Sequence, residues 1–263
     1  MTQTDKAPVI LREFCAENLT HLDVAIAAGA GRIELCDNLA RGGTTPSVGV
    51  VARAVELAHA RGVAVRVIIR PRGGDFCYTD GELSAMERDI EAALALGADG
   101  IVFGCLAPHE ARSHGRAREA ALLTGRLPGD PMPGGYTGGY GLDEAACARL
   151  MARACAAASR RGEPFGATFH MAFDALDRAD QSTGIDAIAD LGFDRILTHG
   201  GPAGTPIEDN LGRLSLFVKR ASGQISILPG GGITYNNAEA VANALGVGEV
   251  HGTRVVALTA GAR

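Results

Sequence analysis

The sequence of 263 residues contains no tryptophan and few other aromatic residues, with eight Phe and four Tyr. Its hydrophobic fraction is nonetheless 46% and its charged fraction 21%, which is the balance of an ordinary soluble protein. This composition excludes a disordered or fibrous chain. It also supplies enough apolar side chain for a sizeable core, and the length suits either one large domain or two small ones.

An excess of positive charge and long hydrophobic runs are also missing. The net charge is -5 and no Lys/Arg cluster is interleaved with aromatics, so we expect no nucleic-acid partner. The polar residues 1–7 form no signal-peptide core, and no apolar run is long enough to span a bilayer, so we expect a cytoplasmic protein without membrane contact. Six scattered cysteines predict reduced thiols rather than a disulfide framework.

A recurring phrase organises the chain: a helical stretch rich in Ala and Leu ends at Gly and is followed by an apolar strand. It reads AAGAGRIEL at 27–35, ALGADGIVF at 95–103, DLGFDRILT at 190–198 and ALGVGEVHG at 244–252, with looser versions at Gly62, Gly162 and Gly223. Gly ends a helix because it adopts the left-handed cap conformation without a steric penalty. With an opening strand at 9–15, the seven caps introduce eight strands. We therefore predict a single α/β domain over 1–263, a (β/α)8 TIM-type barrel with parallel strands; a doubly wound open sheet alternates in the same way.

Two segments break this regularity. Within 106–141, after the fourth strand, the second half (LPGDPMPGGYTGGYG) is too rich in Gly and Pro for a helix or a central strand. We predict a flexible insertion on the strand-end side, either an active-site lid or a surface loop without a role. Residues 252–263 form only a short closing segment after the last strand, which allows a partner subunit to cover the gap in a homo-oligomer.

The carboxyl ends of the barrel strands and their following loops build the active site in this fold, and inward positions alternate along each strand. Glu13 and Cys15 are two residues apart on the first strand, as are Glu34 and Cys36 on the second. If both pairs point inward, two carboxylates and two thiols lie side by side at the mouth. Buried glutamates need positive partners, because an isolated buried charge is costly.

The third strand offers those partners in Arg70 and Arg72, and also in Arg66. The segment RPRGGDF at 70–76 would in addition suit an anionic ligand, through guanidinium groups and exposed backbone N–H groups. The alternative is an Arg–Glu network that only holds the rim together.

The fifth strand ends in TFHMAFD, which offers His170 as a base, an acid or a metal ligand. Asp174, four residues later, is its expected orienting partner. The alternative is a histidine whose hydrogen bonds are satisfied within the core.

Glycines follow the seventh strand as Gly230, Gly231 and Gly232, and a helix begins soon after them. The loops after strands seven and eight usually form the phosphate site of this fold, because Gly exposes backbone N–H groups and the helix N-terminus is electropositive. The turn at 199–201 after the sixth strand could extend this pocket or be only a tight bend.

These segments together resemble the CutC copper homeostasis family. FCAENL, RIELCDNLARGGTTPS, IRPRGGDF, GADGIVFG, TFHMAFD, RILTHGG and PGGGIT occur in the family's order over most of the length. The resemblance implies a barrel fold, a cytosolic role in copper homeostasis, and Cu(I) binding by Cys15 and Cys36. Cu(I) is soft and prefers thiolate ligands, so two adjacent thiols suit it.

The sequence also departs from the family pattern. Met171 stands where the family usually has Arg, and His199 where it usually has Ser. The lost Arg weakens an anion-binding role for this segment, whereas Met171 and His199 are themselves potential copper ligands. The insertion at 106–141 is not typical of the family, and the tail is shorter.

Two functions remain open at this point. The first is a copper homeostasis protein that binds Cu(I) through Cys15 and Cys36. The second is an enzyme acting on a small phosphorylated or carboxylated metabolite, with Arg70, Arg72 and Gly230–Gly232 holding the anion. In that case Glu13, Glu34, His170 and Asp174 would supply acid/base groups or hold a divalent metal.

Overall fold

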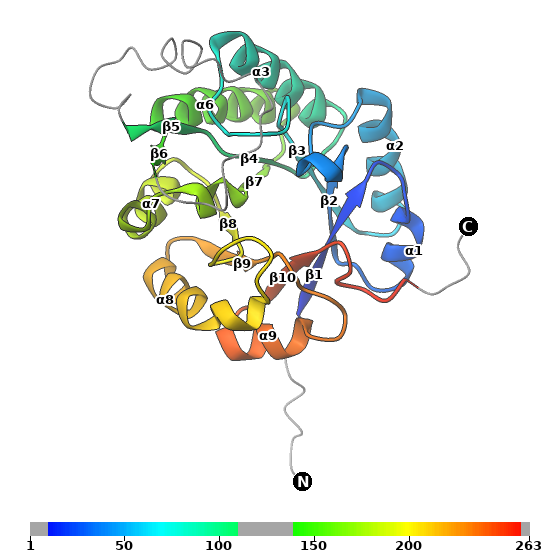
Figure 1. Cartoon of the computed structure of the whole chain (residues 1–263). Helices are drawn as coiled ribbons and strands as arrows, with labels where there is room; N and C mark the ends of the chain where they lie inside the picture. Colours follow the sequence, from blue (N-terminus) through cyan, green and yellow to red (C-terminus); the bar gives the residue numbers. More distant parts are fainter. Residues whose placement is uncertain (1–9, 110–138, 259–263) are drawn as a thin grey trace.

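Eight parallel strands form a ring with helices around its outside (Figure 1) in a computed structural model, which describes residues 10–109 and 139–258. The strands are β1 Leu11–Glu17, β2 Arg32–Cys36, β3 Ala64–Ile68, β4 Gly100–Phe103, β7 Gly166–Phe169, β8 Arg195–Thr198, β9 Ser226–Pro229 and β10 Glu249–Gly252. Each strand pairs in parallel with its neighbour in the order β10-β1-β2-β3-β4-β7-β8-β9.

The ring closes between β9 and β10. These strands stand at the two ends of the pairing order but contact each other in space. The loops that follow these two strands are hydrogen-bonded, since the Tyr235 N–H donates to the Arg254 carbonyl at 2.7 Å. The approach is close: a Cβ atom on Gly252 would lie 2.6 Å from the Ile233 carbonyl oxygen. The predicted barrel is therefore confirmed, because the end strands of an open doubly wound sheet would lie at opposite edges.

The helices follow the strands, and three of them begin at a capping side chain. The helices are α1 Leu22–Ala27, α2 Val48–His59, α3 Asp80–Ala95, α6 Glu144–Arg161, α7 Arg178–Asp190, α8 Leu211–Ala221 and α9 Ala238–Leu245, with short 3-10 turns η1 Leu39–Arg41, η2 Met171–Ala175 and η3 Ile207–Asn210. Thr79 and Glu82 form a capping box at the start of α3. The seven predicted cap glycines all have a positive φ, namely Gly29, Gly62, Gly97, Gly162, Gly192, Gly223 and Gly246.

The main hydrophobic core lies between the strands and the surrounding helices. Outward-facing strand residues such as Phe14, Ile33 and Val65 are buried there. Inward positions on the same strands carry Glu13 and Glu34 instead, both of them buried. A TIM barrel usually fills its interior with branched apolar side chains. The buried glutamates therefore make the lumen the candidate position of the functional site.

The ends of the predicted insertion are more ordered than the sequence indicated. β5 Leu106–Pro108 pairs with β6 Tyr140–Leu142 as a two-stranded antiparallel sheet. In the described part of the Gly/Pro-rich half, residues 139–141, no central strand occurs, since β6 belongs to a separate two-stranded sheet. Residues 110–138 of the predicted insertion lie outside the described residues. No helix in the described part of the chain is both long and apolar enough to cross a membrane.

Candidate metal site in the barrel lumen

The pairing of β1 with β2 brings the predicted cysteines together. Cys15 lies opposite Glu34 and Glu17 opposite Cys36, so the two thiols are diagonal neighbours on the inner face. Their Sγ atoms are 3.6 Å apart, and both side chains are buried. Ile68 and Val102 pack against them, so the thiols lie in an apolar part of the lumen.

Hydrogen bonds involve both thiols, and the surroundings of Cys15 shift its pKa. The hydrogen bond with Cys36, burial, and the nearby Glu34 carboxyl together raise the pKa of Cys15 well above its usual value. The Cys36 thiol donates to the Ala16 carbonyl oxygen at 3.2 Å. None of the six cysteines forms a disulfide.

Glu13 lies deeper in the lumen and is 1% exposed. The Arg32 guanidinium donates to one carboxylate oxygen and the His251 Nδ1 lies 2.8 Å from the other. Burial alone would raise the pKa of Glu13, but the His251 hydrogen bond and the Arg32 charge hold it well below its usual range. Arg32 also pairs with Glu249 at 2.8 Å, so the cation is shared between two carboxylates.

The prediction that arginines of the third strand are the cationic partners of the glutamates was therefore wrong. Arg66 donates to Thr168 and pairs with Asp194, each at 2.8 Å. The partners of Glu13 are instead the Arg32 guanidinium on β2 and the His251 ring on β10.

The two rim arginines are engaged by their own loops. Arg70 Nη1 donates to the carbonyls of residues 41, 42 and 43 at 2.9–3.0 Å, and its Nη2 donates to Gly74 at 2.8 Å. Arg72 pairs with Asp75 and Glu82. These contacts match the alternative role of holding the rim together, and they leave the predicted anion role without support from geometry.

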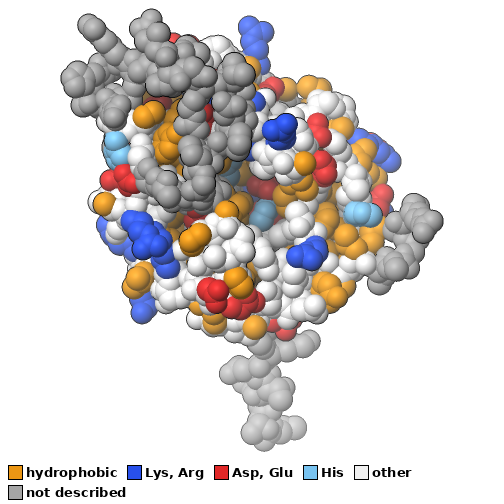
Figure 2. Space-filling model, in the orientation of Figure 1, with side chains coloured by type: hydrophobic (Ala, Val, Ile, Leu, Met, Phe, Trp, Pro, Cys, Tyr) orange, Lys and Arg blue, Asp and Glu red, His pale blue; other side chains and the backbone are white. Residues whose placement is uncertain are grey.

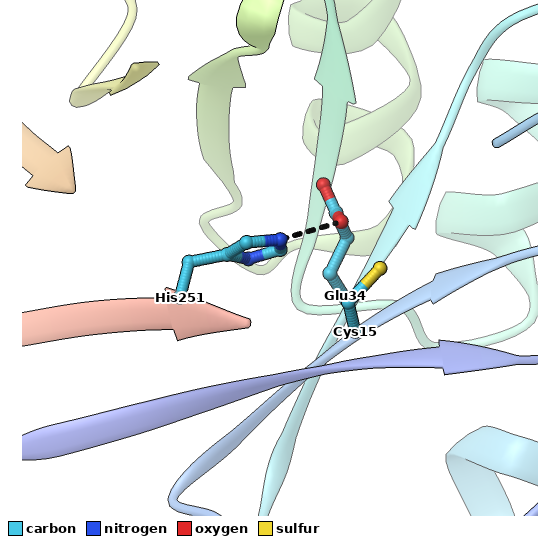
Figure 3. Close-up of side chains that lie close together, drawn as sticks. All are labelled: Cys15, Glu34 and His251. Atoms are coloured by element: carbon cyan, nitrogen blue, oxygen red, sulfur yellow. Dashed lines mark ion pairs between the residues drawn. The ribbon is translucent and has the colours of Figure 1, made fainter. Parts of the chain in front are cut away.

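His251 is the functional residue that sequence reasoning missed. Its Nε2 lies 3.5 Å from Glu34 Oε2, and ligand atoms of Cys15, Glu34 and His251 all lie within 4.8 Å of one another (Figure 3). Burial lowers the pKa of His251, but the Glu34 and Glu13 carboxyls outweigh it and raise the pKa. Burial raises the pKa of Glu34. The motif EVHG at 249–252 carried the signal, because His251 sits two residues after Glu249 near the end of the last strand.

His170 is buried but takes no part in this group. Its Nδ1 accepts a hydrogen bond from the Ala172 N–H at 3.3 Å, and its Nε2 has no partner in the described residues. The ring lies against Phe76 with centroids 4.9 Å apart. Burial and the Arg70 charge lower the pKa of His170 to about 3, so the ring is neutral at pH 7.

Asp174 does not orient His170, so that prediction was wrong. Its carboxylate accepts hydrogen bonds from Thr198 Oγ1 and from the N–H groups of His199 (2.9 Å) and Gly200 (3.2 Å). Burial raises the pKa of Asp174. The residue instead holds the turn after β8.

The other predicted positions have local structural roles. His199 places its ring nitrogens 3.2 Å and 3.1 Å from the carbonyls of Gly201 and Thr205, within its own loop. Met171 begins η2. Gly230 and Gly231 pack tightly, since added Cβ atoms would lie 3.2 Å from the His251 ring and 3.1 Å from the His199 ring. Gly232 has a positive φ of 88° in the same turn.

A family model described as the CutC family matches residues 10–123 and 139–256. The chain belongs to the CutC family. A CutC family protein of Enterococcus faecalis is 45% identical over 94% of this chain and 100% of its own length. The human copper homeostasis protein cutC homolog is 34% identical over 92% of this chain and 72% of its own length. The matched segments omit residues 124–138, which fall in the predicted insertion.

A solved structure shares both fold and sequence with this CutC family member. It is the putative copper homeostasis protein CutC from Streptococcus agalactiae, with a TM-score of 0.77 and 38% identity over 94% of this chain and all of that one. The family membership inferred from sequence is thus confirmed.

On the face of the molecule shown in Figure 2, basic and acidic side chains are interspersed around a hollowed centre.

Proposed function

We propose that the chain is a cytoplasmic copper homeostasis protein that binds Cu(I) through Cys15 and Cys36. The observation that carries the proposal is the 3.6 Å separation of two buried thiols on neighbouring strands. Membership of a family with relatives named for copper homeostasis supports it.

The donor set fits a soft monovalent ion. Two thiolate–metal bonds of about 2.3 Å each, the length of a Zn–S bond, span the 3.6 Å between the sulfurs with a bent S–metal–S angle. The walls of Ile68 and Val102 exclude hard oxygen ligands from this side of the pair, which favours Cu(I) over Mg²⁺ or Ca²⁺. A bound Cu(I) ion would be cargo that the protein holds and passes on, and it would supply no catalytic chemistry.

Anaerobic titration with Cu(I) against a competing chelator tests this proposal. We expect the wild type to retain one Cu(I) per chain, Cys15→Ser and Cys36→Ser to lose most of the affinity, and the double variant to lose it entirely. Cys155→Ser is the matched control, because Cys155 is an exposed thiol far along the chain on α6. Unchanged stoichiometry in the double variant would remove the idea.

A second candidate function is an enzyme acting on a small phosphorylated or carboxylated metabolite. One observation favours it: Glu13, His251 and Glu34 form a buried series of acid–base groups in the lumen, which exceeds what holding one Cu(I) needs. Because Arg70 and Arg72 are engaged, the Gly230–Gly232 turn is the remaining predicted anion site. Thermal-shift measurements with sugar phosphates and small carboxylic acids test this function, and no stabilisation by any anion would count against it.

A further inference from the structure

Three different donor types converge from three neighbouring strands beside the thiol pair. Cys15 on β1, Glu34 on β2 and His251 on β10 offer one sulfur, one oxygen and one nitrogen within 4.8 Å of one another. All three side chains are at least nine-tenths buried. Figure 3 shows the His251 ring facing the Glu34 carboxyl, with the Cys15 sulfur beside Glu34.

The spacing of His251 and Glu34 suits metal ligands better than hydrogen-bond partners. Their Nε2 and Oε2 atoms are 3.5 Å apart, whereas a charge-assisted hydrogen bond brings such atoms to about 2.7–2.9 Å. Two ligands that each lie about 2.0–2.1 Å from a tetrahedral metal ion are roughly 3.3 Å from each other. A small inward shift of either side chain would complete that geometry.

The other ring nitrogen of His251 is already fixed by a carboxylate. Glu13 Oε1 lies 2.8 Å from Nδ1, which leaves Nε2 directed toward Glu34. Metal-bound histidines have this arrangement, in which a carboxylate orients the ring and makes it a better ligand. Arg32 compensates the charge of Glu13, while the only ion pair of Glu34 within the described residues is to His251.

We propose that Cys15, Glu34 and His251 form a site for a zinc-type divalent cation, with Glu13 as the residue that positions the imidazole. Mixed sulfur, nitrogen and oxygen donors suit Zn²⁺, and three protein ligands leave a fourth position for water or a small anion. The site does not use Cys36. It therefore goes beyond the Cu(I) proposal, with which it shares Cys15.

Co²⁺ binding to the full chain under reducing, anaerobic conditions tests the site, because cobalt reports thiolate ligation and tetrahedral geometry by its absorption. We expect one Co²⁺ per chain, with a near-ultraviolet thiolate charge-transfer band and visible tetrahedral bands. The exposed-thiol control Cys155→Ser keeps this spectrum and affinity, and Cys36→Ser keeps the thiolate charge-transfer band because Cys15 remains. Glu34→Gln and His251→Gln weaken binding at least about tenfold, and Glu13→Gln weakens it by roughly 10–100-fold with all three ligands present.

Far-ultraviolet circular dichroism establishes that each variant is folded. If Glu34→Gln does not fold, Glu34→Asp replaces it in the measurement. Wild-type protein without a charge-transfer band, or Glu34→Gln with wild-type Co²⁺ affinity, would overturn the site. Loss of Co²⁺ in Cys36→Ser would also overturn it, since the ion would then belong to the thiol pair. Two variants separate this proposal from the Cu(I) proposal. Cys36→Ser should bind Co²⁺ but lose Cu(I), whereas Glu34→Gln should keep Cu(I) but lose Co²⁺.

Discussion

Replacing Glu13 by glutamine removes a buried charge that contacts both Arg32 and His251. Glu13 is 1% exposed, accepts from Arg32 and lies 2.8 Å from His251 Nδ1. Breaking a buried ion pair from one side costs about 3–5 kcal/mol, because the remaining charge stays buried without compensation. Arg32 keeps its second carboxylate, Glu249, so we expect the lower end, a loss of about 3 kcal/mol in the free energy of unfolding.

Urea unfolding followed by circular dichroism measures this loss, which corresponds to a fall of roughly 6–12 °C in Tm for a chain of this size. The matched control is Glu56→Gln, which makes the same change in an exposed pair with Arg53, where Glu56 is 70% exposed. We expect that control to cost less than about 1 kcal/mol. A Glu13→Gln variant within about 1 kcal/mol of wild type would refute the reasoning.

A double-mutant cycle locates the energy in the pair itself. Arg32→Met removes the guanidinium and keeps much of its apolar length. If the loss in Glu13→Gln comes from a stranded cation, the double variant should cost less than the sum of the single variants, by roughly 1–3 kcal/mol. Additive losses would show that the two side chains act independently.

Three further predictions concern other positions. His170→Asn keeps an acceptor for the next turn and removes the titrating ring. Because the pKa of His170 is about 3 in the folded protein and higher in the unfolded chain, the stability of the wild type rises with pH. Between pH 6.5 and 5, the wild type should therefore lose about 2 kcal/mol more than the variant in urea unfolding, and equal losses would contradict a buried neutral ring. Gly252→Ala should lower stability by about 1–3 kcal/mol through the clash at the ring closure. Gly212→Ala in α8, where an added Cβ meets nothing within 4 Å, should raise stability by about 0.5–1 kcal/mol. Similar Tm shifts in both variants would refute the close approach at Gly252. Arg70→Lys should cost about 2 kcal/mol or more, because an ammonium cannot serve four carbonyls at once, and wild-type Tm would contradict this.

Local sequence patterns were sufficient for the eight strands of the barrel, although not for the β5–β6 pair. Gly at each helix end has a conformational requirement that few other residues meet, so its recurrence marked where each strand would follow. The alternation of strand side chains likewise placed Glu13 with Cys15 and Glu34 with Cys36 on the inner face. Both inferences depend only on residues close together in the chain.

The partners of those residues could not be predicted in the same way. Glu13 meets His251 across 238 positions of sequence, and only because ring closure sets the register of β1 against β10. No local pattern encodes that register. Arg70 was misjudged for a related reason: sequence cannot distinguish a guanidinium that faces the lumen from one that binds carbonyls of the neighbouring loop.

The charged interior itself argues for a function beyond folding. A barrel lumen filled with well-packed apolar side chains would be at least as stable as one that buries Glu13 and Arg32, because desolvation offsets most of the attraction within buried ion pairs. Loss of one member is nevertheless costly, as the Glu13→Gln prediction states. The network fixes the His251 ring through its Nδ1 contact with Glu13, and this is the arrangement that the proposed cation site needs.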